Sequence, residues 1–140
     1  MEPISIEGTP KTPTVKFDAG TGVIEIKGRS IPENSIEFYK PLVDWLEEYA
    51  KGPLEKTIVN VQLEYFNTSS SKCILDVFKK LEAISKAKHD VVINWYYEED
   101  DEDMNELGHI IKSLIECPFR IVKVDNMNDD FYKSLLSRPL

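Results

Sequence analysis

The segment TIVNVQLEYFNTSSSKCILDVFKKLEAISKAK, residues 57–88, contains the two periodicities that decide the fold. In its first part, apolar or aromatic residues occupy every second position from Val59 to Tyr65, which predicts a strand over 57–65 with these residues on one face. In its second part, apolar residues recur at spacings of three and four, which predicts an amphipathic helix over 69–88. A strand followed directly by such a helix is the repeating unit of an α/β fold.

The same unit recurs towards the C-terminus. The apolar density of 91–96 predicts a buried strand, helical spacing predicts a helix over 103–116, and 119–124 is predicted to be the last central strand. A closing helix is predicted over 128–137, with Phe131, Leu135 and Leu136 on its apolar side.

The N-terminal region predicts a β-hairpin followed by a helix. Residues 14–18 and 23–27 both alternate, and a short connection that contains glycine joins them. Residues 4–7 add a short edge strand. Beyond the hairpin, the helical spacing of aromatic and apolar residues from Phe38 to Tyr49 predicts a helix.

Capping boxes predict where two of these helices begin. Ser30 and Glu33 have the spacing of such a box for the first helix, with Pro32 in its first turn, and Asp103 and Glu106 have it for the third. Pro41 lies inside the first helical pattern and lacks an amide hydrogen, so we expect a kink or a restart of the helix there.

These elements predict a single α/β domain spanning residues 1–140, with the hairpin at about 4–27 and alternating helices and strands up to 137. Strands that alternate with helices pair in parallel through crossover connections, whereas the hairpin adds antiparallel pairing. The predicted architecture is therefore a mixed β-sheet of five or six strands with helices packed on it.

Composition excludes several classes of function. The net charge of −8 makes nucleic acid a poor partner, because binding to phosphates needs clustered cations. Apolar runs are too short for membrane insertion, and the N-terminus has no pattern of a secretion signal. The two cysteines, Cys73 and Cys117, fit a reducing compartment, so we expect a cytoplasmic protein.

The turn between the strand and helix of 57–88 is the candidate functional site. It contains Asn67, Thr68, Ser69, Ser70 and Ser71, and four consecutive hydroxyls exceed what capping one helix needs. A helix N-terminus has unpaired amides and a partial positive charge, so a phosphoryl group is stabilised there. Composition alone favours a simple helix cap over a phosphorylation site.

Other polar features predict no catalytic or metal site. The acidic run 98–103 lacks the glycine of a calcium-binding loop, so we expect a solvated acidic loop and no metal. Neither His89 nor His109 has a nucleophile at a suggestive spacing. We therefore expect no cofactor.

The strand, hydroxyl-rich turn and helix resemble the junction that carries the phosphorylated residue in anti-sigma-factor antagonist (STAS) domains. A closer resemblance is to the SiaC family of bacterial regulatory phosphoproteins, and it spans about residues 6–124. Four stretches carry it: Thr9-Pro10-x-Thr12-Pro13-x-Val15-x-Phe17-Asp18, Gly28-Arg29-Ser30-Ile31-Pro32-Glu33-Asn34, Phe38-Tyr39-x-Pro41-Leu42-x-x-Trp45-Leu46-x-x-Tyr49 and Tyr65-Phe66-Asn67-Thr68-Ser69-Ser70-Ser71-Lys72.

The resemblance implies a STAS-like (SpoIIAA-like) fold and a non-enzymatic signalling switch. The threonine that a partner kinase phosphorylates in the family corresponds to Thr68, while Asn67, Ser69, Ser70 and Ser71 would shape the turn. A PP2C-type phosphatase would remove the phosphate. The unphosphorylated form would bind and activate a diguanylate cyclase, which links the switch to cyclic-di-GMP and biofilm formation.

The alternative is a small enzyme or metabolite-binding domain that uses the same helix N-terminus as an anion site. The sequence offers it no convincing base or metal ligands and no Walker-type phosphate loop.

Overall fold

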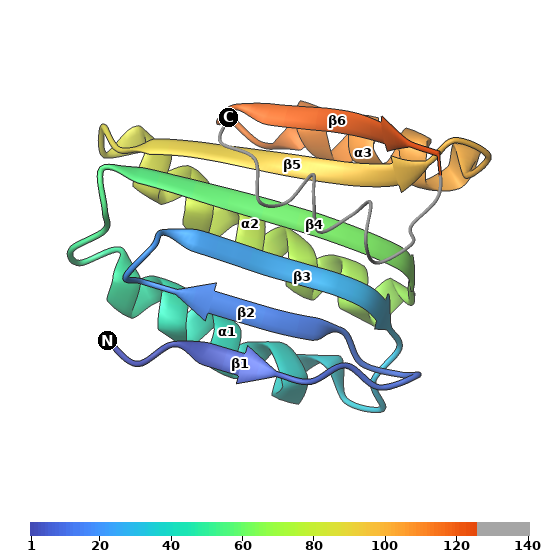
Figure 1. Cartoon of the computed structure of the whole chain (residues 1–140), viewed down its shortest axis with the longest axis horizontal. Coiled ribbons are helices and arrows are strands. Elements are labelled where there is room, and N and C mark those ends of the chain that lie inside the picture. The colour runs from blue at the N-terminus through green and yellow to red at the C-terminus, as the bar shows by residue number, and fades with distance from the viewer. Residues whose placement is uncertain (126–140) are drawn as a thin grey trace.

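The computed structural model describes residues 1–125, which form six strands and three helices (Figure 1). Their bounds are β1 Ile4–Ile6, β2 Thr14–Asp18, β3 Val23–Ser30, α1 Ser35–Tyr49, β4 Lys56–Phe66, α2 Thr68–Lys86, β5 Asp90–Glu98, α3 Glu102–Leu114 and β6 Phe119–Val124. The closing helix predicted over 128–137 lies outside the described residues.

All six strands form one sheet in the order β1-β2-β3-β4-β5-β6. The pairs β1–β2 and β2–β3 are antiparallel, and the pairs from β3 to β6 are parallel. The three helices cover the same face of the sheet (Figure 1). The predicted fold class, a mixed α/β sheet with helices packed on it, is confirmed.

The core lies between the helices and this face of the sheet. In the part of the core that the C-terminal half of the chain forms, Trp95 on β5 is central. Its ring lies against the rings of Phe66, Phe78 and Phe119. Its indole nitrogen donates to the carbonyl of Met104 at 3.0 Å, which joins α3 to the sheet. A β-carbon on Gly108 of α3 would lie 2.7 Å from the Trp95 ring, so α3 approaches this closely because residue 108 is glycine.

The predicted side-chain alternation along β4 is wrong at its end. The register shifts where Gly28 pairs with Leu63 but Arg29 pairs with Tyr65, so β4 contains one extra residue there. This bulge reverses the side-chain alternation. Tyr65 is 52% exposed, and the partly buried Phe66 packs on the core in its place.

Both predicted capping boxes are also wrong. Ser30 is the last residue of β3, and α1 instead has Asn34 as its N-cap, whose side chain accepts from the Glu37 amide at 3.0 Å. Helix α3 is capped by Asp101, which accepts from the Met104 amide at 3.1 Å. Several acceptors lie near each helix start, so spacing did not identify the one used. Helix α1 does not restart at Pro41.

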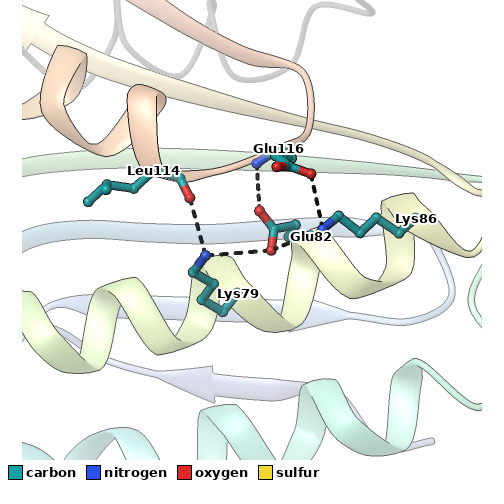
Figure 2. A network of polar contacts seen from close by, with 5 residues as sticks. All are labelled: Lys79, Glu82, Lys86, Leu114 and Glu116. Atoms are coloured by element: carbon teal, nitrogen blue, oxygen red, sulfur yellow. Dashed lines mark hydrogen bonds and ion pairs between the residues drawn. The ribbon is translucent and has the colours of Figure 1, made fainter.

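A buried carboxylate holds the connection between α3 and β6 against α2 (Figure 2). Glu82 on α2 accepts from the backbone amide of Glu116, and Lys86 pairs with the side chain of Glu116 at 3.1 Å. Lys79 donates to the carbonyl of Leu114 at 3.2 Å. These contacts fix the C-terminal end of α3 relative to α2.

Candidate functional site

The hydroxyl-rich turn lies at the carboxyl end of β4, immediately before α2 (Figure 1). Asn67 is the N-cap of α2, with an extended backbone, and its side-chain oxygen accepts from the Ser70 amide at 2.9 Å. The same oxygen accepts from the Ser69 hydroxyl at 3.2 Å. The Asn67 amide donates to the carbonyl of Ser30 at 3.1 Å, which holds the turn against the end of β3.

Thr68 is the first residue of α2 and is exposed to solvent. Its hydroxyl has no hydrogen-bond partner within residues 1–125, although its carbonyl accepts from the Ser71 hydroxyl at 2.6 Å. The predicted position of this residue, in the turn where the helix begins, is confirmed. Since Asn67 supplies the cap, the Thr68 hydroxyl is not needed for capping α2.

Ser69 and Ser70, by contrast, belong to a chain of side-chain hydrogen bonds, in which Ser70 is buried and Ser69 is exposed. Ser70 is fully buried, and its hydroxyl accepts from Ser30 at 3.0 Å and contacts Ser35 at 3.2 Å. Ser30 also bonds to the phenol of Tyr39 at 2.6 Å, and Ser35 bonds to Ser69 at 2.8 Å. This chain, which we call the hydroxyl network, connects β3, α1 and α2.

The hydroxyl network is neutral at physiological pH, and burial makes its phenol a still weaker acid. Desolvation raises the pKa of Tyr39 to about 12, although the hydrogen bond with Ser30 acts in the opposite direction. The phenol therefore keeps its proton at physiological pH and acts as a hydrogen-bonding group. The network consists of groups that position one another, and it contains neither a general base nor an activated nucleophile.

Sequence reasoning missed the contributions of Ser30, Ser35 and Tyr39 to this site. A usable signal was present, because a helix was predicted between the strands at 23–27 and 57–65, and a helix is the usual crossover between parallel neighbours. The carboxyl ends of adjacent parallel strands share one edge of the sheet, so the connection after β3 had to lie beside the turn after β4. The hydrogen bonds from Ser30 and Ser35 to α2 show this arrangement.

The remaining sequence candidates lie elsewhere. The acidic run 98–103 extends from the end of β5 into the first turn of α3, and Asp101 caps that helix. Within the described part of the chain, no three His, Cys, Asp or Glu residues are grouped closely enough to hold a metal ion. His109 bonds to the carbonyl of Asn105 on its own helix. None of the helices over 1–125 combines the length and apolar character needed to cross a membrane.

Comparisons with known proteins agree on one family. Residues 6–124 match the model of the family described as SiaC family regulatory phosphoprotein. A protein of Pseudomonas aeruginosa strain UCBPP-PA14 is 31% identical over 121 residues, which cover 86% of this chain and 96% of the relative.

Solved structures show the same fold. SiaC of Pseudomonas aeruginosa superposes with a TM-score of 0.81 at 27% identity, over 89% of this chain and 100% of SiaC. A second match is to a chain in the crystal structure of the diguanylate cyclase SiaD in complex with its activator SiaC, from the same species. The TM-score is 0.82 at 30% identity, over 86% of this chain and 99% of the matched chain. The chain therefore belongs to the SiaC family of regulatory phosphoproteins.

Proposed function

We propose that this protein is a non-enzymatic switch that is controlled by phosphorylation of Thr68. The observation that carries the proposal is the contrast within the turn: the Thr68 hydroxyl is exposed and has no partner in the described structure, whereas Ser69 and Ser70 take part in the hydroxyl network. A kinase can therefore reach Thr68 without disrupting the packing of the turn. In the reaction, the Thr68 oxygen takes the γ-phosphoryl group of ATP, and ADP and a proton are released.

The proposed output is activation of a diguanylate cyclase by the unphosphorylated form. Support comes from SiaC of Pseudomonas aeruginosa, which has the same fold and is the activator in a complex with the cyclase SiaD. A PP2C-type phosphatase would return the phosphorylated form to the active pool. We place the switch in the cytoplasm, where ATP and GTP are available to the kinase and the cyclase.

Electrostatics explain how a phosphate would favour the free protein. The group carries a charge of about −1.5 to −2 and lies where the free amides of α2 create a partial positive charge. Lys72 follows Thr68 by four residues on the same helix, a spacing at which oppositely charged groups interact. A partner packed over this turn would strip water from the phosphate, so phosphorylation opposes binding.

The test is the intact mass of the protein after incubation with its cognate kinase and ATP. We expect one added phosphate on the wild type, none on Thr68→Ala, and one on Ser69→Ala as the matched control. The phosphatase should remove it. Phosphate addition to Thr68→Ala, or no addition to the wild type by an active kinase, would show that Thr68 is not the acceptor.

A further inference from the structure

The amino ends of β4, β5 and β6 surround a cavity of about 620 Å³, which we call the amino-end cavity. The end of α2 supplies Ser85 and Lys88 to its lining, and the strands supply Lys56 and Arg120 among others. It lies at the opposite end of β4 from the turn that contains Thr68 (Figure 1). The 11 residues of this strand separate the two places by about 30 Å, at roughly 3.3 Å per residue. The cavity has the size of a small-molecule site and shares no residue with the turn.

Positive charge is concentrated in this cavity, although the net charge of the protein is −8. Lys56, Lys88 and Arg120 line it together with one carboxylate, that of Asp90. Three cations and one carboxylate give a local charge of +2, and His89, which also lines the cavity, adds to it when protonated. Within residues 1–125, none of the three cations forms an ion pair, because every ion pair there uses another lysine. The positive charge of the cavity is therefore not compensated by its neighbours.

Lys88 is held at the cavity in a backbone conformation that favours glycine. Its φ is 74°, and no other non-glycine residue of the described chain has a positive φ. It follows Ala87, the C-cap of α2, and glycine is the usual residue at this position because it has no β-carbon. A cation near a helix C-terminus is favourable, but Lys86 already supplies one in the last turn. A lysine in a strained conformation that lines a cavity indicates a role in binding a ligand.

An apolar wall lies beside these cations. Val91, Val92 and Pro118 line the cavity, and Pro118 is exposed, so a flat ring can pack on it. The cations come from the end of α2, from β4 and from β6, so they can contact one anionic group from several sides. An arginine and two lysines match phosphate oxygens, which accept several charge-assisted hydrogen bonds.

We propose that the amino-end cavity binds a nucleoside diphosphate, a small molecule with two phosphate groups and a flat ring. The phosphate groups contact Lys56, Lys88 and Arg120. The ring packs on Val92 and Pro118. A nucleic acid does not suit the cavity, because the net charge of −8 repels a long polyanion. The proposal goes beyond the proposed function and does not rest on it.

The test is calorimetric titration of the full chain with ADP. We expect saturable binding with a Kd below about 1 mM, weaker binding of inorganic pyrophosphate, which lacks the ring, and no binding of adenosine, which lacks the phosphates. Raising the ionic strength should weaken the binding of ADP, since the cations are exposed.

Variants of the cavity test which side chains bind the phosphates. Lys56→Gln and Arg120→Gln change exposed side chains, so the fold is retained, and each should raise the Kd for ADP by about tenfold. The matched control is Lys11→Gln, which removes an exposed lysine that does not line the cavity and has no ion pair within the described residues. This control should bind ADP as the wild type does.

Lys88→Gly distinguishes a ligand site from a simple helix cap. Glycine adopts the left-handed conformation without strain, so this variant should unfold at a higher temperature than the wild type. Its Kd for ADP should nevertheless rise by about tenfold, because a cation of the cavity is lost. A lysine that only caps the helix would leave the binding of ADP unchanged.

Several outcomes would overturn the proposal. These are no saturable binding of ADP by the wild type below about 1 mM, binding of adenosine as tight as that of ADP, and unchanged affinity for ADP in all three cavity variants. Binding of an acidic peptide by a protein that does not bind ADP would also overturn it and would make the cavity a contact site for protein. Thr68→Ala should bind ADP as the wild type does, so the result is independent of the proposed function.

Discussion

The Ser35 hydroxyl lies 2.8 Å from the Ser69 hydroxyl, so the first residue of α1 touches the second residue of α2. The two helices follow neighbouring parallel strands, and their N-termini meet at one edge of the sheet. Their free amides and partial positive charges are therefore concentrated beside Thr68. A charge added to Thr68 acts on both helix ends, and the hydroxyl network is the physical connection between them.

Removing the hydroxyl of Ser70 should destabilise the fold. Ser70→Ala deletes the buried contacts with Ser30 and Ser35, so we expect a loss of about 0.5–1.5 kcal/mol in the free energy of unfolding in urea. Ser71→Ala is the control, because the Ser71 hydroxyl bonds only to the carbonyl of Thr68 within the described structure. Equal stability of the two variants would show that the network contributes no net stabilisation.

Asn67, rather than Thr68, should be the residue on which the start of α2 depends. Asn67→Ala removes the acceptor of the Ser70 amide and should lower the free energy of unfolding by about 0.5–2 kcal/mol. Thr68→Ala removes an exposed hydroxyl and should change it by less than about 0.5 kcal/mol. Thermal or urea unfolding of both variants measures the difference. A larger effect of Thr68→Ala would assign the cap to Thr68.

The carboxylate of Glu82 should make stability depend on pH in the acidic range. The hydrogen bond from the Glu116 amide, with help from Lys79 and Lys86, lowers the pKa of Glu82 below its value of 4.5 in an unfolded chain, against the opposing effect of burial. A group whose pKa is lower in the folded state stabilises the fold above its unfolded pKa, and this contribution is lost as the pH falls through the folded pKa.

Wild-type stability should therefore fall more steeply below pH 4.5 than that of Glu82→Gln. The measurement is the free energy of unfolding of both proteins from pH 7 to pH 3. Glu48→Gln is a control, since it removes a carboxylate whose ion pair with Lys51 lies on an exposed surface. Parallel curves for the wild type and Glu82→Gln would show that this carboxylate does not stabilise the fold.

Sequence periodicity predicted most of the fold because burial on one face of a strand or helix fixes the spacing of apolar residues. The strand 119–124 was predicted at its exact bounds, and β4 and α2 to within two residues at each end. Tyr65 was misplaced because a bulge changes the alternation, and a bulge depends on pairing with Gly28 and Arg29, which are distant in sequence.

The candidate site was predicted only in part, because local sequence patterns do not show which distant residues pair. Thr68 and Asn67 lie in one continuous turn, so local pattern located them, and the position of Thr68 agrees with the prediction. Ser35 and Tyr39 reach the turn only through the pairing of β3 with β4. Their own sequence context is that of ordinary helix residues, and only the topology brings them to the site.

Gly108 should be required for the close packing of α3 on the sheet. A methyl group on residue 108 would lie 2.7 Å from the ring of the buried Trp95, so Gly108→Ala must push α3 outward and should cost about 1–3 kcal/mol in stability. The tryptophan fluorescence should shift as well. Gly52→Ala is the control, because nothing lies within 4 Å of the added carbon. Full stability of Gly108→Ala would show that α3 adapts without cost.

The charge at position 68 should decide whether the cyclase binds. Thr68→Ala should bind like the wild type and ignore the kinase, whereas Thr68→Asp should weaken binding by less than the true phosphate does, because one carboxylate has less charge and fewer acceptors. A difference of a few kcal/mol between the affinities of the two forms is enough for a switch. Calorimetric titration of the cyclase with the wild type, both variants and the phosphorylated protein measures the four affinities.

The dependence of binding on salt concentration distinguishes two effects of the phosphate on Thr68, an interaction with Lys72 at the surface and dehydration under the partner. If the phosphate and Lys72 interact at the surface, raising the ionic strength should reduce the difference between phosphorylated and unphosphorylated protein, since exposed charges are screened. If the phosphate is dehydrated under the partner, the difference should persist at high salt, because a desolvation cost is not screened. The proposed packing of the cyclase over the turn requires the second result. Phosphorylated protein that binds as tightly as the wild type at every salt concentration would exclude Thr68 from the interface.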